Sequence, residues 1–163
     1  DIVFTGTPEG VGPLKSGDQI EMGFIDEVHR ELGKIVWDKI GMARNEAGLK
    51  EALTEIPKIK ESFWKNILIP GSDKDVNQEL EKALRIKDFI ELAELMAYDA
   101  LDRKESCGAH FREEFQTDEN EAERNDEDYK YVAAWDYSEG ENPKLFKEQL
   151  KYKNVKLKTR SYK

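Results

Sequence analysis

The chain has 163 residues, a length that suits one domain with a buried core, and 38% of its residues are apolar while 37% are charged. This composition favours a soluble, mainly helical protein over a membrane protein, because no run reaches the roughly 18 apolar residues of a membrane span. The net charge of −9 is unevenly placed: residues 102–141 carry fourteen acidic and five basic side chains, whereas residues 144–163 carry one acidic and eight basic. An acidic chain whose basic tail has no recognition motif is not expected to bind nucleic acid.

The first 24 residues contain a glycine-rich loop after a strand-like run, in the stretch DIVFTGTPEGVGPLKSGD. Its glycines suggest a phosphate-binding loop at first sight, but the spacing fits neither G-x-x-x-x-G-K-[ST] nor G-x-G-x-x-G. Pro13 directly follows Gly12, and Ser16 to Asp18 form a further turn signal. We therefore expect a strand that ends in a loop, with no phosphate cradle.

A helical period begins at Ile25 and is expected to end near Gly41. Its apolar residues recur at spacings of three and four, with charged residues on the opposite face. They are Ile25, Val28, Leu32, Ile35 and Val36.

A second helix is expected to begin at Asn45, whose side chain suits the N-cap position. The apolar stripe comprises Leu49, Leu53, Ile56, Ile59, Phe63 and Ile67. Pro57 removes one backbone donor within this pattern, so a kink or a short break is expected there. The stretch IPGSDKD ends the helix.

The third and longest helix is expected over about residues 76–105. Its apolar residues spread over more than one face, which is typical of the middle helix of a bundle. They are Leu80, Leu84, Ile86, Phe89, Ile90, Leu92, Leu95, Met96 and Leu101.

After Ser106 the helical period disappears, and a long acidic connection leads to two strand-like stretches. The first alternates through Tyr131, Ala133, Trp135 and Tyr137, and the second through Val155 and Leu157. Between them SEGENP carries turn residues. An antiparallel pair is expected, and because two strands alone are marginally stable, it should lie on another element.

Two histidines and one cysteine are the candidates for metal or nucleophile chemistry. His29 lies in HRELG, which lacks the second histidine of H-E-x-x-H, so a surface histidine is expected. Cys107 and His110 share one loop, which has two interpretations. One is a Cys-His nucleophile pair, and the other is a loop held by arginine–carboxylate and histidine–backbone bonds. The second interpretation is favoured, and a zinc site lacks its remaining ligands. We predict no catalytic residue and no metal.

The stretch TGTPEGVGPLKSGD resembles a segment in the C-terminal part of the fumarylacetoacetate hydrolase family. That resemblance implies a vestigial substrate loop formed by Thr5, Thr7, Gly10 and Gly12, with Thr7 at the position of a substrate-contacting threonine. The family also needs an acidic metal triad upstream. Residues 1–24 are therefore interpreted as a hydrolase-like remnant without activity.

A longer resemblance covers about residues 25–163. The stretches HRELGKIVWDKIGMARNEAGLKEALTEIPKIKESFW, NQELEKALRIKDFIELAELMAYDALDRKESCGAHFREEFQ, RNDEDYKYVAAWDY and NVKLKTRSYK resemble the C-terminal domain of the flavoprotein subunit of succinate dehydrogenase and fumarate reductase. The loop resembles that family's S-R-G-A-H-x-R-x-D element, with Cys107 in place of the usual arginine. Gly108, His110, Arg112 and Glu114 are the candidate residues for a structural or interface role.

The resemblance implies an FAD-dependent parent enzyme of the tricarboxylic acid cycle or of electron transport, whose flavin is held by domains that would precede Ile25. This chain itself is expected to bind no cofactor. The expected partners are the flavin-binding domain of the parent chain and the iron–sulfur subunit. With a single cysteine, no signal peptide at Asp1 and no direct membrane insertion, the expected location is the cytoplasmic, inner face of the membrane, reached through partner subunits.

The predicted fold is mainly α: a three-helix bundle with a C-terminal extension that contains a small antiparallel β pair. The predicted divisions are a chimeric remnant at 1–24, the bundle at 25–106, and an acidic, β-rich extension at 107–163. The predicted function is a scaffold and docking domain that is not catalytic alone. Two alternatives stay open: a metal-dependent hydrolase fragment, and a stand-alone helical interaction module that exposes Phe63, Trp64, Trp37 or Trp135.

Overall fold

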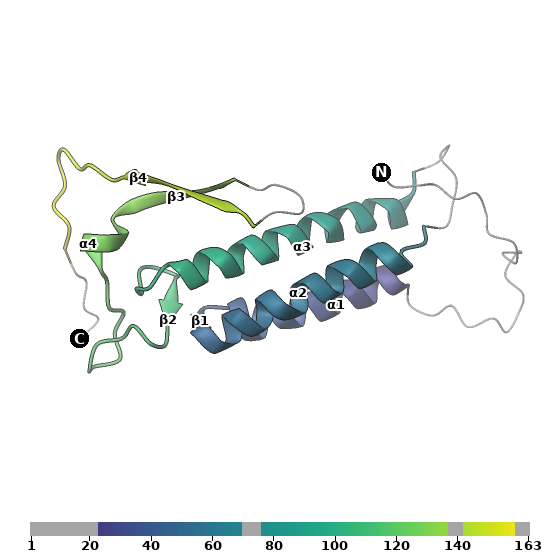
Figure 1. The fold of residues 1–163 in the computed structure, drawn as a ribbon, viewed down its shortest axis with the longest axis horizontal. Coiled ribbons are helices and arrows are strands. Elements are labelled where there is room, and N and C mark those ends of the chain that lie inside the picture. Colours follow the sequence, from purple (N-terminus) through teal and green to yellow (C-terminus); the bar gives the residue numbers. More distant parts are fainter. Residues whose placement is uncertain (1–22, 70–75, 137–141, 159–163) are drawn as a thin grey trace, which may run out of the picture.

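The structure is a computed structural model that describes residues 23–69, 76–136 and 142–158 (Figure 1). Three long helices lie side by side, and a two-stranded ribbon lies along the last of them. In chain order the elements are α1 (Phe24–Ile35), the π-helical turn η1 (Val36–Ile40), β1 (Ala43–Arg44), α2 (Glu46–Asn66), α3 (Gln78–Asp102), β2 (Phe111–Arg112), α4 (Asp126–Tyr129), β3 (Tyr131–Asp136) and β4 (Lys144–Gln149). The predicted fold class is confirmed.

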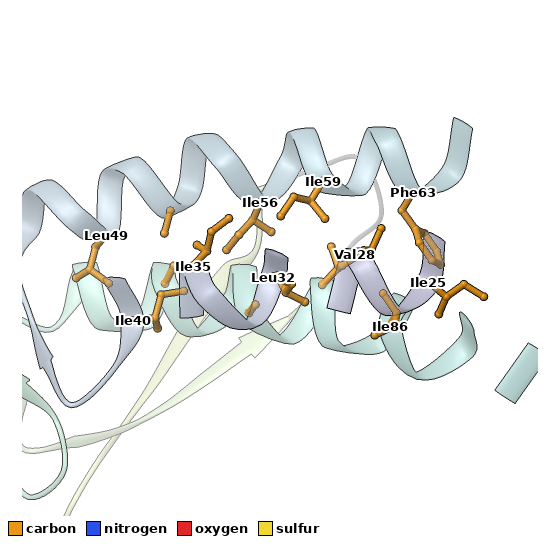
Figure 2. Packing of buried hydrophobic residues seen from close by; sticks show 14 of the residues in the cluster. Ile25, Val28, Leu32, Ile35, Ile40, Leu49, Ile56, Ile59, Phe63 and Ile86 are labelled. Atoms are coloured by element: carbon orange, nitrogen blue, oxygen red, sulfur yellow. The ribbon is translucent and has the colours of Figure 1, made fainter. Parts of the chain in front are cut away.

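The core is formed by one apolar seam from each helix, and the helices alternate in direction along the chain (Figures 1 and 2). Each seam repeats at alternating spacings of three and four residues, which is the coiled-coil-like pattern of helical bundles. The seams are Ile25, Val28, Leu32 and Ile35 in α1, Leu49, Ala52, Ile56, Ile59 and Phe63 in α2, and Ala83, Ile86, Ile90, Ala93, Ala97 and Ala100 in α3.

The first helix ends as predicted near Gly41, after the π-helical turn of η1. A Cβ atom at Gly41 would lie 2.5 Å from the carbonyl oxygen of Trp37, closer than real contacts allow. Only glycine therefore permits this close approach of the backbone, which directs the chain into β1 and on to α2.

The second helix begins where the sequence predicts. The Asn45 side chain accepts a hydrogen bond of 2.8 Å from the backbone N–H of Gly48, which satisfies one of the free donors of the first turn. The break expected at Pro57 is absent, since α2 runs without interruption through this residue. Pro57 itself is exposed and lies outside the buried seam of α2, so its ring does not interrupt the core packing.

The third helix differs from the sequence prediction in the residues that it buries. The residues expected to be buried on more than one face were all large, and of these Ile86 and Ile90 are buried, whereas Leu84, Phe89, Leu92 and Met96 are 41–54% exposed. The buried seam of α3 is rich in alanine instead. Small side chains let α3 approach α1 and α2 closely, so the large apolar residues occupy a second face that the bundle does not cover.

We expect the Ala97→Leu variant to lower the free energy of unfolding by about 1–3 kcal/mol, because Ala97 is fully buried and the added side chain overpacks the seam. Urea unfolding followed by circular dichroism measures the change. The matched control is Asp88→Leu, on a side of α3 where the side chain is 73% exposed. Equal losses in the two variants would contradict the close packing of α3.

The C-terminal extension contains the predicted antiparallel pair, but its second strand was predicted wrongly. β4 is Lys144–Gln149, directly after the turn, and residues 154–158 form no strand. The register pairs Trp135 with Leu145 and Tyr131 with Gln149. The ribbon lies on α3, where the indole N–H of Trp135 donates a 2.7 Å hydrogen bond to Asp99.

Candidate functional site

The candidate loop folds back on the C-terminal end of α3. Cys107 and His110 exchange backbone hydrogen bonds of 2.8 and 3.1 Å across a tight turn. Gly108 lies in that turn with a φ of +62°, a conformation that favours glycine. β2 then pairs in parallel with β1, with Arg112 opposite Arg44, so the loop reaches the start of α2. The structure thus brings together Gly108, His110, Arg112 and Glu114.

Arg112 is the central side chain of this loop and is only 1% exposed. Its guanidinium donates hydrogen bonds of 2.8 and 3.4 Å to the carbonyl oxygens of Ala100 and Leu101, in the last turn of α3. These carbonyls have no partner within the helix, and the positive charge also complements the negative end of the helix dipole. Arg112 therefore stabilises the C-terminus of α3.

Glu114 links Arg112 to the second helix. One carboxylate oxygen accepts a 3.1 Å hydrogen bond from the Arg112 guanidinium, and the other accepts from the backbone N–H of Glu46, the first residue of α2. Partial burial alone would raise the pKa of the Glu114 carboxyl, but donors from the Glu46 and Glu114 backbone and from Arg112 lower it. The pair therefore joins the C-terminus of α3 to the N-terminus of α2.

A second polar cluster, which the sequence analysis did not identify, lies next to this loop. Arg103 forms a 2.6 Å ion pair with Glu105, which is only 3% exposed, and its guanidinium lies over the rings of Tyr129 and Tyr131. Glu105 also accepts a 2.8 Å hydrogen bond from the backbone N–H of Asn125. A sequence signal was present in the charged run RKES at the end of the helical period. This cluster attaches the extension to the bundle.

His110 is held by the backbone. Its Nε2–H donates a 3.0 Å hydrogen bond to the carbonyl oxygen of Arg103. Burial lowers the pKa of the His110 imidazole; the Arg103 carbonyl acts in the opposite direction, and the charges of Arg44, Arg103 and Arg112 lower the pKa further. Cys107 is exposed at the rim of the turn. This geometry favours the structural interpretation of the loop over a nucleophile pair.

We expect the folded protein to lose stability as the pH falls through the range below 6.5, and we assign part of this loss to His110. Because its pKa is lower in the folded state than in the unfolded state, the unfolded chain binds the proton first, and stability falls until the folded-state pKa is passed. The His110→Gln variant keeps a donor for Arg103 but cannot titrate. Between pH 7.5 and 5, the free energy of unfolding of this variant should fall less steeply than that of the wild type, by at most ~1.4 kcal/mol per pH unit. Identical slopes would contradict the assignment.

Of the other candidate residues, the structure describes His29 but not those of the glycine-rich loop. Thr5, Thr7, Gly10 and Gly12 lie outside the described residues. His29 is exposed on α1, 5.9 Å from Phe89 between ring centroids. Within residues 23–69, 76–136 and 142–158, no group of three or more His, Cys, Asp or Glu side chains could hold a metal ion. Over the same part of the chain, no helix has the length and apolarity to cross a membrane.

The predicted exposed aromatic patch is wrong in two of its four members. Phe63 is 1% exposed and belongs to the core, and Trp135 is half-buried against α3. Trp37 is 83% exposed and Trp64 is 41% exposed, as expected. Four further exposed apolar side chains lie on α3: Leu84, Phe89, Leu92 and Met96.

Fold and loop together define a helical bundle domain in which an arginine–glutamate pair connects two helix ends. A family model described as fumarate reductase flavoprotein C-term matches residues 29–162. The chain belongs to this family, and the predicted resemblance over the bundle and extension is confirmed.

Relatives and solved structures agree with this assignment. An uncharacterized FAD-dependent oxidoreductase of Methanocaldococcus jannaschii is 38% identical over 85 residues, 52% of this chain and 15% of the relative. The fumarate reductase flavoprotein subunit of Helicobacter pylori is 31% identical over 124 residues, 76% of this chain and 17% of the relative. The chain thus spans less than one fifth of the length of either protein.

A structure of Escherichia coli quinol fumarate reductase matches the fold with a TM-score of 0.65 at 22% identity, over 82% of this chain and 22% of that one. The Mycobacterium smegmatis Sdh1 complex with UQ1 matches with a TM-score of 0.65 at 25% identity, over 77% of this chain and 20% of that one. None of these matches names a hydrolase, so they lend no support to the hydrolase-like interpretation of residues 1–24.

Proposed function

We propose that this chain supplies the scaffold and subunit-docking C-terminal domain of a succinate dehydrogenase or fumarate reductase flavoprotein and is not catalytic alone. The observation that carries the proposal is the family match over residues 29–162, which coincides with an intact helical bundle and extension. The match to less than one fifth of the relatives' length supports a role as one part of a larger enzyme.

We further propose that FAD is bound by other parts of the parent flavoprotein. A groove of about 730 Å³ between α1, η1 and α2 offers no anion site for the pyrophosphate of a flavin dinucleotide. Its lining balances three carboxylates against three ammonium groups, and ion pairs join Lys39 to Glu51 and Glu55, so no net positive charge faces the groove. We therefore assign no flavin chemistry to this groove.

The loop residues have two proposed roles. Arg112 and Glu114 fix the bundle ends, while Gly108 and His110 shape the exposed turn that docks on neighbouring parts of the parent complex. The proposed partners are the flavin-binding domain and the iron–sulfur subunit, and the proposed location is the cytoplasmic face of the membrane through partner subunits. The division into 1–24, 25–106 and 107–163 stays a prediction.

The purified chain should be colourless and inactive with succinate and an artificial electron acceptor, and equally inactive in the reduction of fumarate. Absorbance near the flavin bands and a dye-reduction assay measure both properties. The Helicobacter pylori flavoprotein subunit, loaded with flavin, serves as the positive control. A stoichiometric flavin band that co-purifies with this chain would contradict the proposal.

A further inference from the structure

The second apolar face of α3 has no cover in the described structure. Phe89, Leu92 and Met96 follow at spacings of three and four and thus lie on one side of the helix, 41–54% exposed. Leu84, 43% exposed, lies two turns before Leu92 within the same half of the helix circumference. We call these four residues the open face. The exposed side chains of Arg85 and Asp88 lie on the same half of the helix circumference. A group of exposed apolar side chains with charged neighbours is typical of an interaction site.

The open face continues a surface that is already used for packing. The β3–β4 ribbon covers α3 from Tyr98 onward, with 6.5 Å between the ring centroids of Tyr98 and Trp135 and a hydrogen bond from Trp135 to Asp99. The uncovered part ends two residues before Tyr98, at Met96. The ribbon therefore contacts α3 at its C-terminal end, and the open face lies N-terminal to that contact.

The start of α1 lies beside the N-terminal part of the open face. Asp26 forms a 3.4 Å ion pair with Lys82, and the ring of His29 lies 5.9 Å from that of Phe89. A groove of about 250 Å³ between the two helices is lined by Ile25, His29, Arg85 and Phe89, among others. The N-terminus of α1 therefore lies next to the open face, at the end of the bundle where α3 begins (Figure 1).

The relatives are much longer than this chain, and most of their polypeptide lies outside the matched segment. The matching family model describes the C-terminal part of the flavoprotein, and the chain covers 15% and 17% of two relatives. We propose that the open face of α3 and the adjoining groove are the surface on which the preceding, flavin-binding part of the flavoprotein packs. This inference rests on the proposed function and identifies the face that performs the docking.

The test compares the solvent access of the open face in the isolated chain and in a full-length chimera. In the chimera, residues 29–162 replace the matching segment of the Helicobacter pylori flavoprotein subunit. Cys107→Ser is present throughout, and Leu92→Cys or Met96→Cys places a thiol in the open face. Glu61→Cys, on the exposed side of α2, is the matched control. Alkylation by iodoacetamide is followed by mass spectrometry on the peptide that carries each thiol.

Alkylation at position 92 or 96 should be at least about tenfold slower in the chimera than in the isolated chain, with an unchanged rate at position 61. Circular dichroism of each isolated variant shows that the bundle is folded. A flavin-containing chimera with equal rates at positions 92 and 96 in both proteins, or with the same protection at position 61, would overturn this inference and leave the proposed function intact. Concentration-dependent protection in the isolated chain would overturn it in favour of a second copy. A folded chimera that retains no flavin would contradict the proposed function itself.

Discussion

The Arg112→Met variant should lose about 3 kcal/mol of unfolding free energy relative to the wild type. Arg112 is only 1% exposed, and its guanidinium bonds the carbonyl oxygens of Ala100 and Leu101 as well as the Glu114 carboxylate. Methionine keeps much of the buried stem but supplies none of these donors. The C-terminal carbonyls of α3 then stay buried without a partner.

The expected size of this loss follows from the exposure of each partner. A buried acceptor left without a donor costs about 1–3 kcal/mol, and two helix carbonyls are affected here. Glu114 is 37% exposed, so its carboxylate can recover water and contributes less than a fully buried charge would. The Arg112→Lys variant retains a charge but cannot span both helix ends, and we expect an intermediate loss of about 1–2 kcal/mol.

Urea unfolding at neutral pH measures these differences, provided that the slope of the transition is unchanged. The matched control is Arg85→Met, also on α3, where the side chain is 67% exposed and pairs with Glu81. An exposed pair of this kind contributes at most about 0.5 kcal/mol. Similar losses at Arg112 and Arg85 would refute the role of Arg112 as the connection between α3 and α2.

Helix positions were predictable because apolar spacing and helix-start residues act locally. The repeat that begins at Ile25 marks α1, and Asn45 marks the start of α2 by the hydrogen bond that it accepts. Which face of α3 is buried was not predictable from side-chain size. Alanine is apolar but small, so its stripe gives a weak signal, although it allows the closest approach between helices.

The second strand was missed for a related reason. The β4 residues that pair with Tyr131, Ala133 and Trp135 are Gln149, Lys147 and Leu145, and only Leu145 is apolar, so alternation is hardly visible. Lys147 is explained by partners distant in sequence, since its ammonium lies 4.4 Å from the Tyr131 ring and 3.7 Å from Asp102. Such compensation becomes visible only in the folded structure.

The candidate loop was located from its residues, but its role depends on long-range contacts. The sequence places Arg112 among charged neighbours, which also suits an exposed loop. In the structure the Arg112 side chain is buried at the C-terminal end of α3, because the pairing of β2 with β1 holds this part of the loop against the bundle. Of the structural and interface roles that the sequence left open for Arg112, its contacts in the interior favour the structural one.

The Phe63→Ala variant should lose about 3–5 kcal/mol of unfolding free energy, the usual cost of removing a buried aromatic side chain. Phe63 is 1% exposed and points from α2 into the core at the end of the bundle where Ile25 lies (Figure 2). The rings of Phe63 and Trp64 also form an edge-to-face pair with 5.3 Å between their centroids, and the variant removes this contact.

The neighbouring Trp64 provides the matched control, because it is 41% exposed and lies one position further along the same helix. Trp64→Ala removes the same ring contact but opens no cavity in the core, so its loss should stay near 1 kcal/mol. Phe63→Leu, which keeps most of the buried volume, should lose less than about 1.5 kcal/mol. Urea unfolding of the three variants separates cavity formation from loss of the aromatic pair. Equal losses in Phe63→Ala and Trp64→Ala would place both rings on the surface, as the alternative of a stand-alone interaction module allows, and would contradict the seam that α2 contributes to the core.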